Sequence, residues 1–227
     1  MRQPTSAIAG NARRTRWLIW ALWVVGTTLG AALGLALDAP VYAGSLRVFS
    51  LINSEDAILT LAVIGSFGVY IACIALGQGM ALAGALALKH TGGVGRFRLW
   101  TLATAFAALS VIPLYVFEGQ PPFAALSLAQ PGASPVVNAL LTLVSLAVVS
   151  APIGVFVGAA QGLTLREVRQ WGGRWAWRWL AISALGWGIA WPAGLLIGDA
   201  FSFYAGVILC WAALASVTGI AISRALA

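Results

Sequence analysis

The sequence predicts an all-α polytopic membrane protein with six transmembrane helices, arranged as three repeated helical hairpins. Composition, the length of the apolar runs and the placement of charge support this prediction. Of the 227 residues, 61% are hydrophobic and only 8% are charged, and the mean hydropathy is +0.93. Soluble domains are about half apolar and about a quarter charged. The chain has too little charge to cover a water-exposed surface of this size, so we expect it in lipid.

Six apolar runs are separated by polar segments. A bilayer core requires about 20 helical residues, and lipid-exposed backbone must satisfy its own hydrogen bonds, so each run is predicted to form a helix. The runs show no period-two alternation, which argues against a membrane β-barrel. They cover residues 17–37, 57–88, 99–117, 136–165, 179–198 and 201–222.

The first run follows a short basic stretch, as a secretory signal does. It has 21 residues, however, which is longer than a usual signal core and long enough to span a bilayer. We therefore expect a retained first span after a short cytoplasmic tail (residues 1–15). The whole chain is then one transmembrane domain with hairpin repeats at about 16–89, 98–166 and 178–224.

Charged residues lie at the ends of the runs and between them. With the N-terminus inside, the cytoplasmic segments hold twelve of the thirteen basic residues and one acid, a net +11. The opposite segments hold Arg47 and five acids, a net −4. The positive-inside rule then predicts six spans with both termini cytoplasmic. The scattered basic residues form no patch on one domain, which argues against a nucleic-acid partner.

Two runs are longer than a span requires. Residues 57–88 and 136–165 number 32 and 30. At about 1.5 Å per residue, each exceeds the hydrocarbon core by about 15 Å. We expect these helices to tilt, protrude or break, with residues 65–68 (Gly-Ser-Phe-Gly) and Pro152 as the weak points.

Internal repetition is the most specific pattern. Arg16, Arg98 and Arg178 open the odd-numbered spans beside an aromatic residue, at intervals of 82 and 80 residues. Each even-numbered span closes with two aliphatic residues spaced by two and then a basic residue. Any hairpin that starts and ends in the cytoplasm needs basic anchors and aromatic belts. That alternative explains the residue types but not the regular spacing, so we favour a triplication.

One segment resembles a known group of proteins. Residues 160–166 read AQGLTLR, and residues 179–187 read WLAISALGW. This pair resembles uncharacterised bacterial polytopic membrane proteins in which an AQ-x-L-x-L-R segment precedes a W-x-x-A-S-A-L-G-W helix and hairpins recur. Ile182 and, in the first copy, Gly84 depart from that pattern. The resemblance implies a repeated-hairpin architecture and a bacterial inner-membrane setting, and it implies no particular activity.

Glycines spaced by four recur in three spans. Such glycines allow two helix backbones to approach closely. They predict either packing within the bundle or a docking face for another membrane protein, for which the first helix is the best candidate. The motifs are Gly26, Gly30 and Gly34; Gly154 and Gly158; and Gly194 and Gly198.

No charged residue or histidine lies deep in any run. Proton relays, ion-coupled carriers and voltage sensors usually place such groups at depth. An intramembrane enzyme also needs a base or paired carboxylates, so we expect no enzymatic activity. Cys73 and Cys210 fall in apolar runs and are predicted to be buried thiols. His90 has no companion ligands, so we expect neither a metal nor another cofactor.

A few polar residues lie within the runs. Gln78 and Gln161 occupy two even-numbered spans, and Tyr70 lies in the first of these. Interhelical hydrogen bonds are the simplest role for such groups. The alternative is that they line a pocket for a solute.

Aromatic and basic residues alternate before the fifth span. This pattern predicts an anchor in the headgroup layer or, alternatively, recognition of anionic lipid. The residues are Arg174, Trp175, Trp177, Arg178 and Trp179.

An acid follows each odd-numbered span, namely Asp38, Glu118 and Asp199. These three acids are predicted to mark the outer helix ends, and a ring of carboxylates that attracts cations is the alternative.

Two functions fit these features. The first is a structural or accessory subunit that docks through glycine-rich helix faces. The second is a small transporter or pore for a neutral or lipophilic solute, built between the hairpins.

Overall fold

The computed structural model describes residues 5–50, 54–88, 94–110, 132, 134–165, 173–200 and 202–226. Within these ranges every regular element is an α-helix, which confirms the predicted all-helical class. Four helices contain segments long and apolar enough to cross a membrane: Asn11–Phe49, Ala57–Ala87, Pro135–Thr164 and Tyr204–Leu226. The helices are α1 (Thr5–Phe49), α2 (Glu55–Ala87), α3 (Val94–Leu109), α6 (Pro135–Leu165), α7 (Gly173–Ala200) and α8 (Phe203–Leu226).

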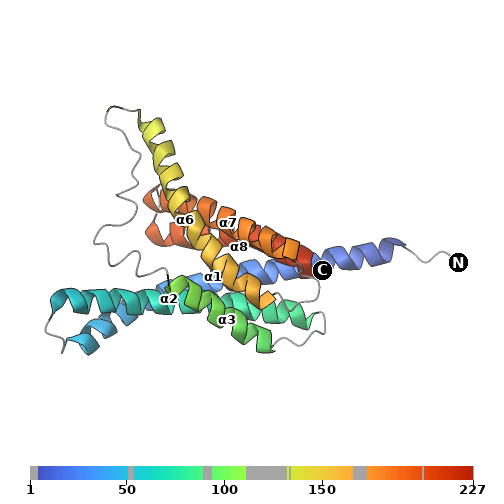
Figure 1. Cartoon of the computed structure of the whole chain (residues 1–227), viewed down its shortest axis with the longest axis horizontal. Coiled ribbons are helices and arrows are strands. Elements are labelled where there is room, and N and C mark those ends of the chain that lie inside the picture. The colour runs from blue at the N-terminus through green and yellow to red at the C-terminus, as the bar shows by residue number, and fades with distance from the viewer. Residues whose placement is uncertain are drawn as a thin grey trace.

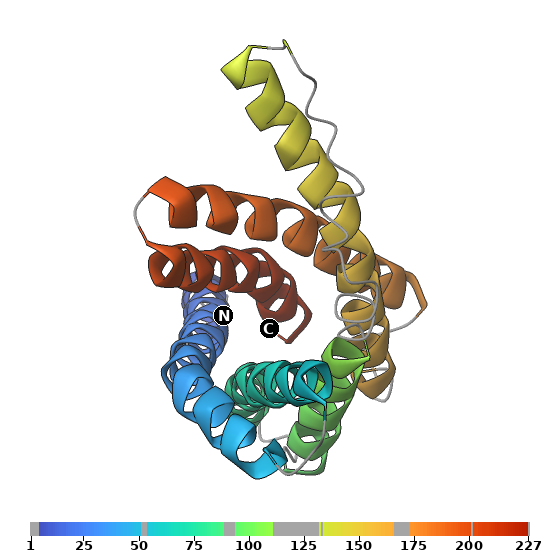
Figure 2. The ribbon, with the colours of Figure 1, turned by 90° about the vertical axis from the view of Figure 1, so that its left-hand side faces the viewer.

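The described helices form a closed ring in chain order (Figure 2). Each helix packs against its neighbours in the sequence, and α8 returns to pack against α1. Successive helices run in opposite directions, so α1 begins and α8 ends on the same side of the bundle (Figure 1). We call this side the terminal end, and the side where α1 stops and α2 starts the distal end.

Helix α1 is much longer than its apolar run. It spans 45 residues and continues past Asp38 and Pro40 to Arg47 in its last turn. The expected tail is therefore helical from Thr5 onward, and Asp38 lies inside helix α1 rather than after its end. An apolar run marks the part of a helix that lipid can cover, and the helix itself can continue into water. Arg47 complements the negative end of the helix dipole there.

Helices α2 and α6 are continuous over 33 and 31 residues. Neither the Gly-Ser-Phe-Gly segment at 65–68 nor Pro152 breaks its helix, so both helices extend beyond the length that a bilayer requires. Ser54 caps the first turn of α2, where its hydroxyl oxygen accepts a hydrogen bond from the Ala57 amide at 3.3 Å. Helix α3 is described only to Leu109, and the rest of the predicted run to residue 117 lies outside the described residues.

The glycines of α1 pack against α2. A Cβ atom added at Gly26 would lie 2.6 Å from the carbonyl oxygen of Gly77, and one added at Gly30 would lie 2.5 Å from that of Cys73. At Gly34, an added Cβ would lie 2.7 Å from the Tyr70 ring. Only glycine permits these approaches, so this face of α1 is occupied within the chain.

The other glycine pairs also pack internally. Gly154 and Gly158 on α6 lie against Ser183 of α7, and Gly194 on α7 lies against Cys210 of α8. Gly198 is also in α7, but its surroundings lie outside the described part of the structure. The six described glycines of these motifs therefore form seams between consecutive helices.

We expect Gly30→Ala to lower the free energy of unfolding by about 1–3 kcal/mol, because its methyl group would meet the α2 backbone. Gly44→Ala is the matched control in the same helix, since nothing lies within 4 Å of its added Cβ. We expect the control to be neutral or stabilising by up to about 1 kcal/mol. Unfolding of the purified protein in detergent measures both, and equal effects would contradict the assigned seam.

Candidate functional site

A small cavity of about 20 Å³ lies in the centre of the ring. Five of the six described helices each contribute one amide or hydroxyl residue to its wall, α1 contributes Trp23, and the remainder of the wall is apolar or aromatic. Its volume is close to the roughly 10–15 Å³ that a single water molecule requires. The amide, hydroxyl and indole residues are Trp23 (α1), Gln78 (α2), Thr104 (α3), Gln161 (α6), Ser183 (α7) and Thr218 (α8).

Gln161 is the centre of the polar wall. Its amide nitrogen donates one hydrogen bond to the side-chain oxygen of Gln78 and another to the hydroxyl of Thr104, both at 3.1 Å. The two bonds join α6 to α2 and to α3. All three side chains are buried, so water outside the bundle does not compete for these bonds. The structure thus brings together the two glutamines that the sequence singled out.

Several polar groups in the wall remain unused. Within the described structure, the amide nitrogen of Gln78, the carbonyl oxygen of Gln161 and the hydroxyl of Ser183 make no hydrogen bond. These residues are at most 6% exposed. Leaving such groups unpaired in an apolar interior costs about 1–3 kcal/mol each. The site therefore suits an uncharged molecule that both donates and accepts hydrogen bonds.

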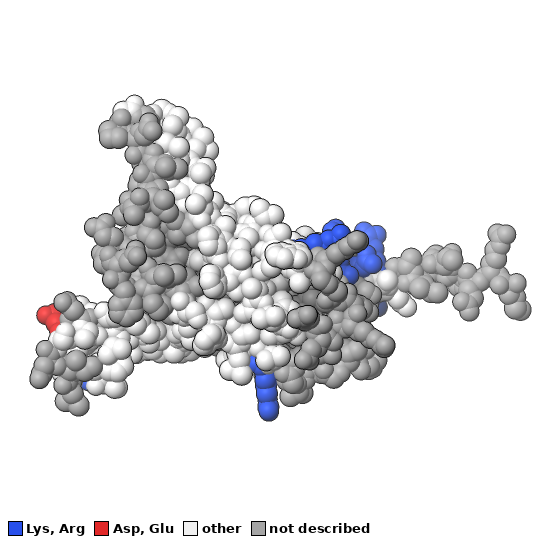
Figure 3. Space-filling view, in the orientation of Figure 1, with Lys and Arg blue, Asp and Glu red and all other residues white. Residues whose placement is uncertain are grey.

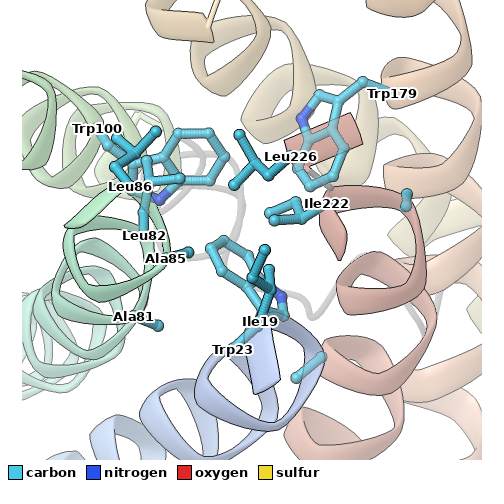
Figure 4. Close-up of a cluster of buried hydrophobic side chains, with 12 residues drawn as sticks. Ile19, Trp23, Ala81, Leu82, Ala85, Leu86, Trp100, Trp179, Ile222 and Leu226 are labelled. Carbon is cyan, nitrogen blue, oxygen red and sulfur yellow. The ribbon is translucent and has the colours of Figure 1, made fainter. Parts of the chain in front are cut away.

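A tryptophan cluster packs beside the cavity on its terminal side, and Figure 4 shows the side chains of this cluster. Trp23 and Trp179 line the cavity, and the ring of Trp100 lies edge to face with both, at centroid distances of 5.5 and 5.9 Å. The Trp23 indole donates to the Thr218 hydroxyl at 3.0 Å, which joins α1 to α8. Ile19, Ile222 and Leu226 fill the remaining space beside these rings. We call the three tryptophans and these three aliphatic residues the terminal plug.

A second aromatic cluster closes the cavity toward the distal end. The indole of Trp211 donates a hydrogen bond to the Tyr70 hydroxyl, and Trp187 packs edge to face on Trp211. Trp187 and Trp211 line the cavity, whereas Tyr70 lies behind Trp211 and does not. Tyr70 thus positions the wall of the cavity. We call Tyr70, Trp187 and Trp211 the distal plug.

The predicted headgroup anchors divide between two faces of α7. Trp177 is 75% exposed and Arg178 is exposed, as an anchor requires. Trp179 is fully buried in the terminal plug, and Trp175 stacks on it at 5.8 Å, so assigning Trp179 to the anchor is wrong. Residues two apart on a helix point about 200° apart, which puts Trp177 and Trp179 on opposite faces. Arg174 lies in α7, but its side chain is outside the described part.

The three predicted outer acids do not form a described cluster. Asp38 lies within α1 and Asp199 near the end of α7, where its side chain is not described. Glu118 lies outside the described residues. A carboxylate ring therefore remains a prediction.

Few other side chains in the described part could bind a metal ion or react as nucleophiles. Cys73 and Cys210 are buried, unbridged thiols, as expected. Among the described side chains, no three His, Cys, Asp or Glu residues are grouped as metal ligands. His90 lies outside the described residues.

Sequence reasoning missed Thr104, Ser183, Trp211 and Thr218. Their only signal was polarity or aromaticity inside an apolar run, and hydroxyls there usually bond to their own helix. Thr218 does so, donating to the Leu214 carbonyl at 2.8 Å.

In comparisons with protein-family models, curated proteins and solved structures, nothing matches this chain. The geometry of the central site therefore carries the functional argument.

We expect a double-mutant cycle of Gln78→Leu and Gln161→Leu to give a coupling energy of about 0.5–1.5 kcal/mol, as for other buried interhelical hydrogen bonds. Unfolding in mixed detergent micelles measures it. The control pairs Gln78→Leu with Ser110→Ala, since the Ser110 hydroxyl bonds only to the Phe106 carbonyl of its own helix. Additive effects in the glutamine pair would contradict a shared buried network.

Proposed function

We propose that the chain is a non-enzymatic multi-pass protein of the bacterial inner membrane that conducts or transports a small uncharged polar solute. One observation carries the proposal: five of the six described helices contribute an amide or hydroxyl side chain to one central cavity, and the sixth, α1, contributes the indole of Trp23. A bundle that only had to be stable gains little from polar groups gathered at one point, because each must be desolvated. A solute site needs such convergence.

The wall of the cavity selects against ions. None of the side chains lining it is charged. Moving an isolated charge into such an interior costs tens of kcal/mol by simple solvation estimates. Unused amide and hydroxyl groups offer hydrogen bonds without net charge. The solute class is therefore a neutral hydrogen-bonding molecule, of which water is the smallest.

The two plugs describe a closed state. The terminal plug and the distal plug lie on opposite sides of the cavity along the bundle, and each packs aromatic side chains between the cavity and one end. A cavity of about 20 Å³ holds a water-sized molecule, whereas sites for drug-sized ligands measure about 300–1,000 Å³. Passage of anything larger requires helices to separate. Opening one plug at a time would give access from alternate sides.

The proposal includes six spans in three hairpins with both termini cytoplasmic. Alternating helix directions and the common location of the α1 start and the α8 end support it (Figure 1). The distribution of charge supports it as well. In Figure 3 the largest group of basic side chains lies toward the terminal end and an acidic patch lies at the distal end, where Arg47 ends α1. The lipid bilayer is then the partner of the outer faces, which carry many exposed aliphatic residues.

Transport can be tested in proteoliposomes by stopped-flow light scattering. The panel comprises water, ammonia, urea and glycerol, each compared with protein-free vesicles. We expect faster permeation of at least one of these, and at least a tenfold loss of the protein-dependent rate in Gln161→Leu. Ser110→Ala should keep the wild-type rate. Rates equal to those of empty vesicles for the whole panel would contradict the proposal.

A second candidate is a structural or accessory subunit that docks on another membrane protein. The tight interior favours it, because a static bundle needs no larger cavity. The described glycine faces are occupied within the chain, so docking would use an outward apolar face. Such a face lies on the first half of α6, where Val136, Leu140 and Val144 are 69%, 57% and 52% exposed.

This second candidate predicts a stoichiometric complex in mild detergent that Leu140→Gln dissociates. Val25→Gln on the outer face of α1, where Val25 is 54% exposed, is the control and should leave the complex intact. Light scattering coupled to size exclusion gives the composition. A strictly monomeric protein without a partner would argue against docking.

A further inference from the structure

Two exposed arginines lie at the same level on neighbouring helices at the terminal end. Arg178 directly precedes Trp179 on α7, and Arg224 lies between Ile222 and Leu226 on α8. Trp179, Ile222 and Leu226 belong to one packed cluster, so the two arginines share its level along the bundle axis. Both arginine side chains are exposed.

Helical periodicity places both arginines on the outer surface of the ring. Arg224 follows Val217 and Ile220 at spacings of seven and four, and these two residues are 43% and 46% exposed. Arg178 precedes Leu185 by seven, and Leu185 is 61% exposed. Residues seven apart lie on nearly the same side of a helix. Each guanidinium therefore stands at the end of an apolar stripe that faces outward.

Their charges are not neutralised by the described part of the chain. Neither Arg178 nor Arg224 makes an ion pair with a described residue. Of the described acids, Asp38 lies in the distal part of α1 and Glu55 opens α2, so both lie toward the distal end. Trp177, which is 75% exposed, lies beside Arg178 in the sequence, and tryptophan favours the headgroup layer.

We propose that Arg178 and Arg224 form a binding site for an anionic glycerophospholipid at the α7–α8 seam. The lipid phosphate accepts hydrogen bonds from the two guanidinium groups, whose planar forks match phosphate oxygens. Its acyl chains lie along the outward stripes below, over Val217, Ile220 and Leu185. This site is separate from the central cavity and does not depend on transport.

The test uses the full-length protein in detergent, titrated with phosphatidylglycerol or phosphatidylcholine and followed by native mass spectrometry. We expect tighter binding of phosphatidylglycerol, because a basic residue near an anionic lipid surface contributes about 1 kcal/mol. Each of Arg178→Gln and Arg224→Gln should then weaken it about fivefold, and the double variant about 25-fold. Phosphatidylcholine binding should not change, and inorganic phosphate should not displace the bound lipid.

Arg47→Gln is the matched control, since it removes an exposed arginine at the distal end of α1. It should keep wild-type lipid affinity. An equal loss in this control would show a general effect of net charge and overturn the site, as would unchanged affinity in the double variant. If the double variant does not fold, the two single variants decide: about fivefold losses support the site, and wild-type affinities overturn it.

Discussion

The ring depends on contacts that lipid cannot replace. Acyl chains are as apolar as leucine, so apolar side chains alone provide little reason for helices to associate in a bilayer. Close backbone approach and buried hydrogen bonds supply it instead. Glycine seams join α1 to α2, α6 to α7 and α7 to α8. Indole hydrogen bonds join α1 to α8, through Trp20 to the Ser216 carbonyl and Trp23 to Thr218.

Helix α3 is held differently. Its described links to the neighbouring helices include a 3.5 Å hydrogen bond from the Thr101 hydroxyl to the Ala75 carbonyl of α2, and the bond from Gln161 of α6 to Thr104. No described glycine brings a backbone against α3, since Gly68 meets only Leu109 at an ordinary 3.6 Å. The ring is therefore least tightly joined on both sides of α3. Separation there would expose the polar wall of the cavity first.

The sequence predicted the bounds of the helices better than it predicted which side chains face the interior of the ring. Apolar runs placed α2 and α6 within two residues of their observed bounds, because lipid-facing composition and helix length coincide there. They failed for α1, where the helix extends beyond the apolar run at both ends. The helices are apolar all round, so periodicity did not tell the side that faces the axis from the side that faces lipid. Trp179 was misassigned for that reason.

The candidate site was predicted only in part. Gln78 and Gln161 stood out because an amide inside an apolar run needs a partner. Their pairing depends on the ring, which turns the two side chains toward each other although α3 separates α2 from α6 in the ring order. Thr104 and Ser183 carried no such signal, since a hydroxyl can bond within its own helix. Which residues face one another is a property of packing between segments distant in sequence.

The interactions that hold the centre shut are also those a solute would use. Moving α3 away from α6 breaks the bond between Gln161 and Thr104 and leaves the buried Thr104 hydroxyl unpaired, at about 1–3 kcal/mol, while Gln161 keeps its bond to Gln78. Lipid offers no replacement for that bond, whereas a neutral hydrogen-bonding solute does. A solute that hydrogen-bonds to both Gln161 and Thr104 would replace the bond between them. It would thereby offset the free-energy cost of separating α3 from α6. In the proposed transporter, separation of the helices therefore depends on whether a solute occupies the cavity. This coupling needs no buried charge, which fits a cavity lined by uncharged side chains.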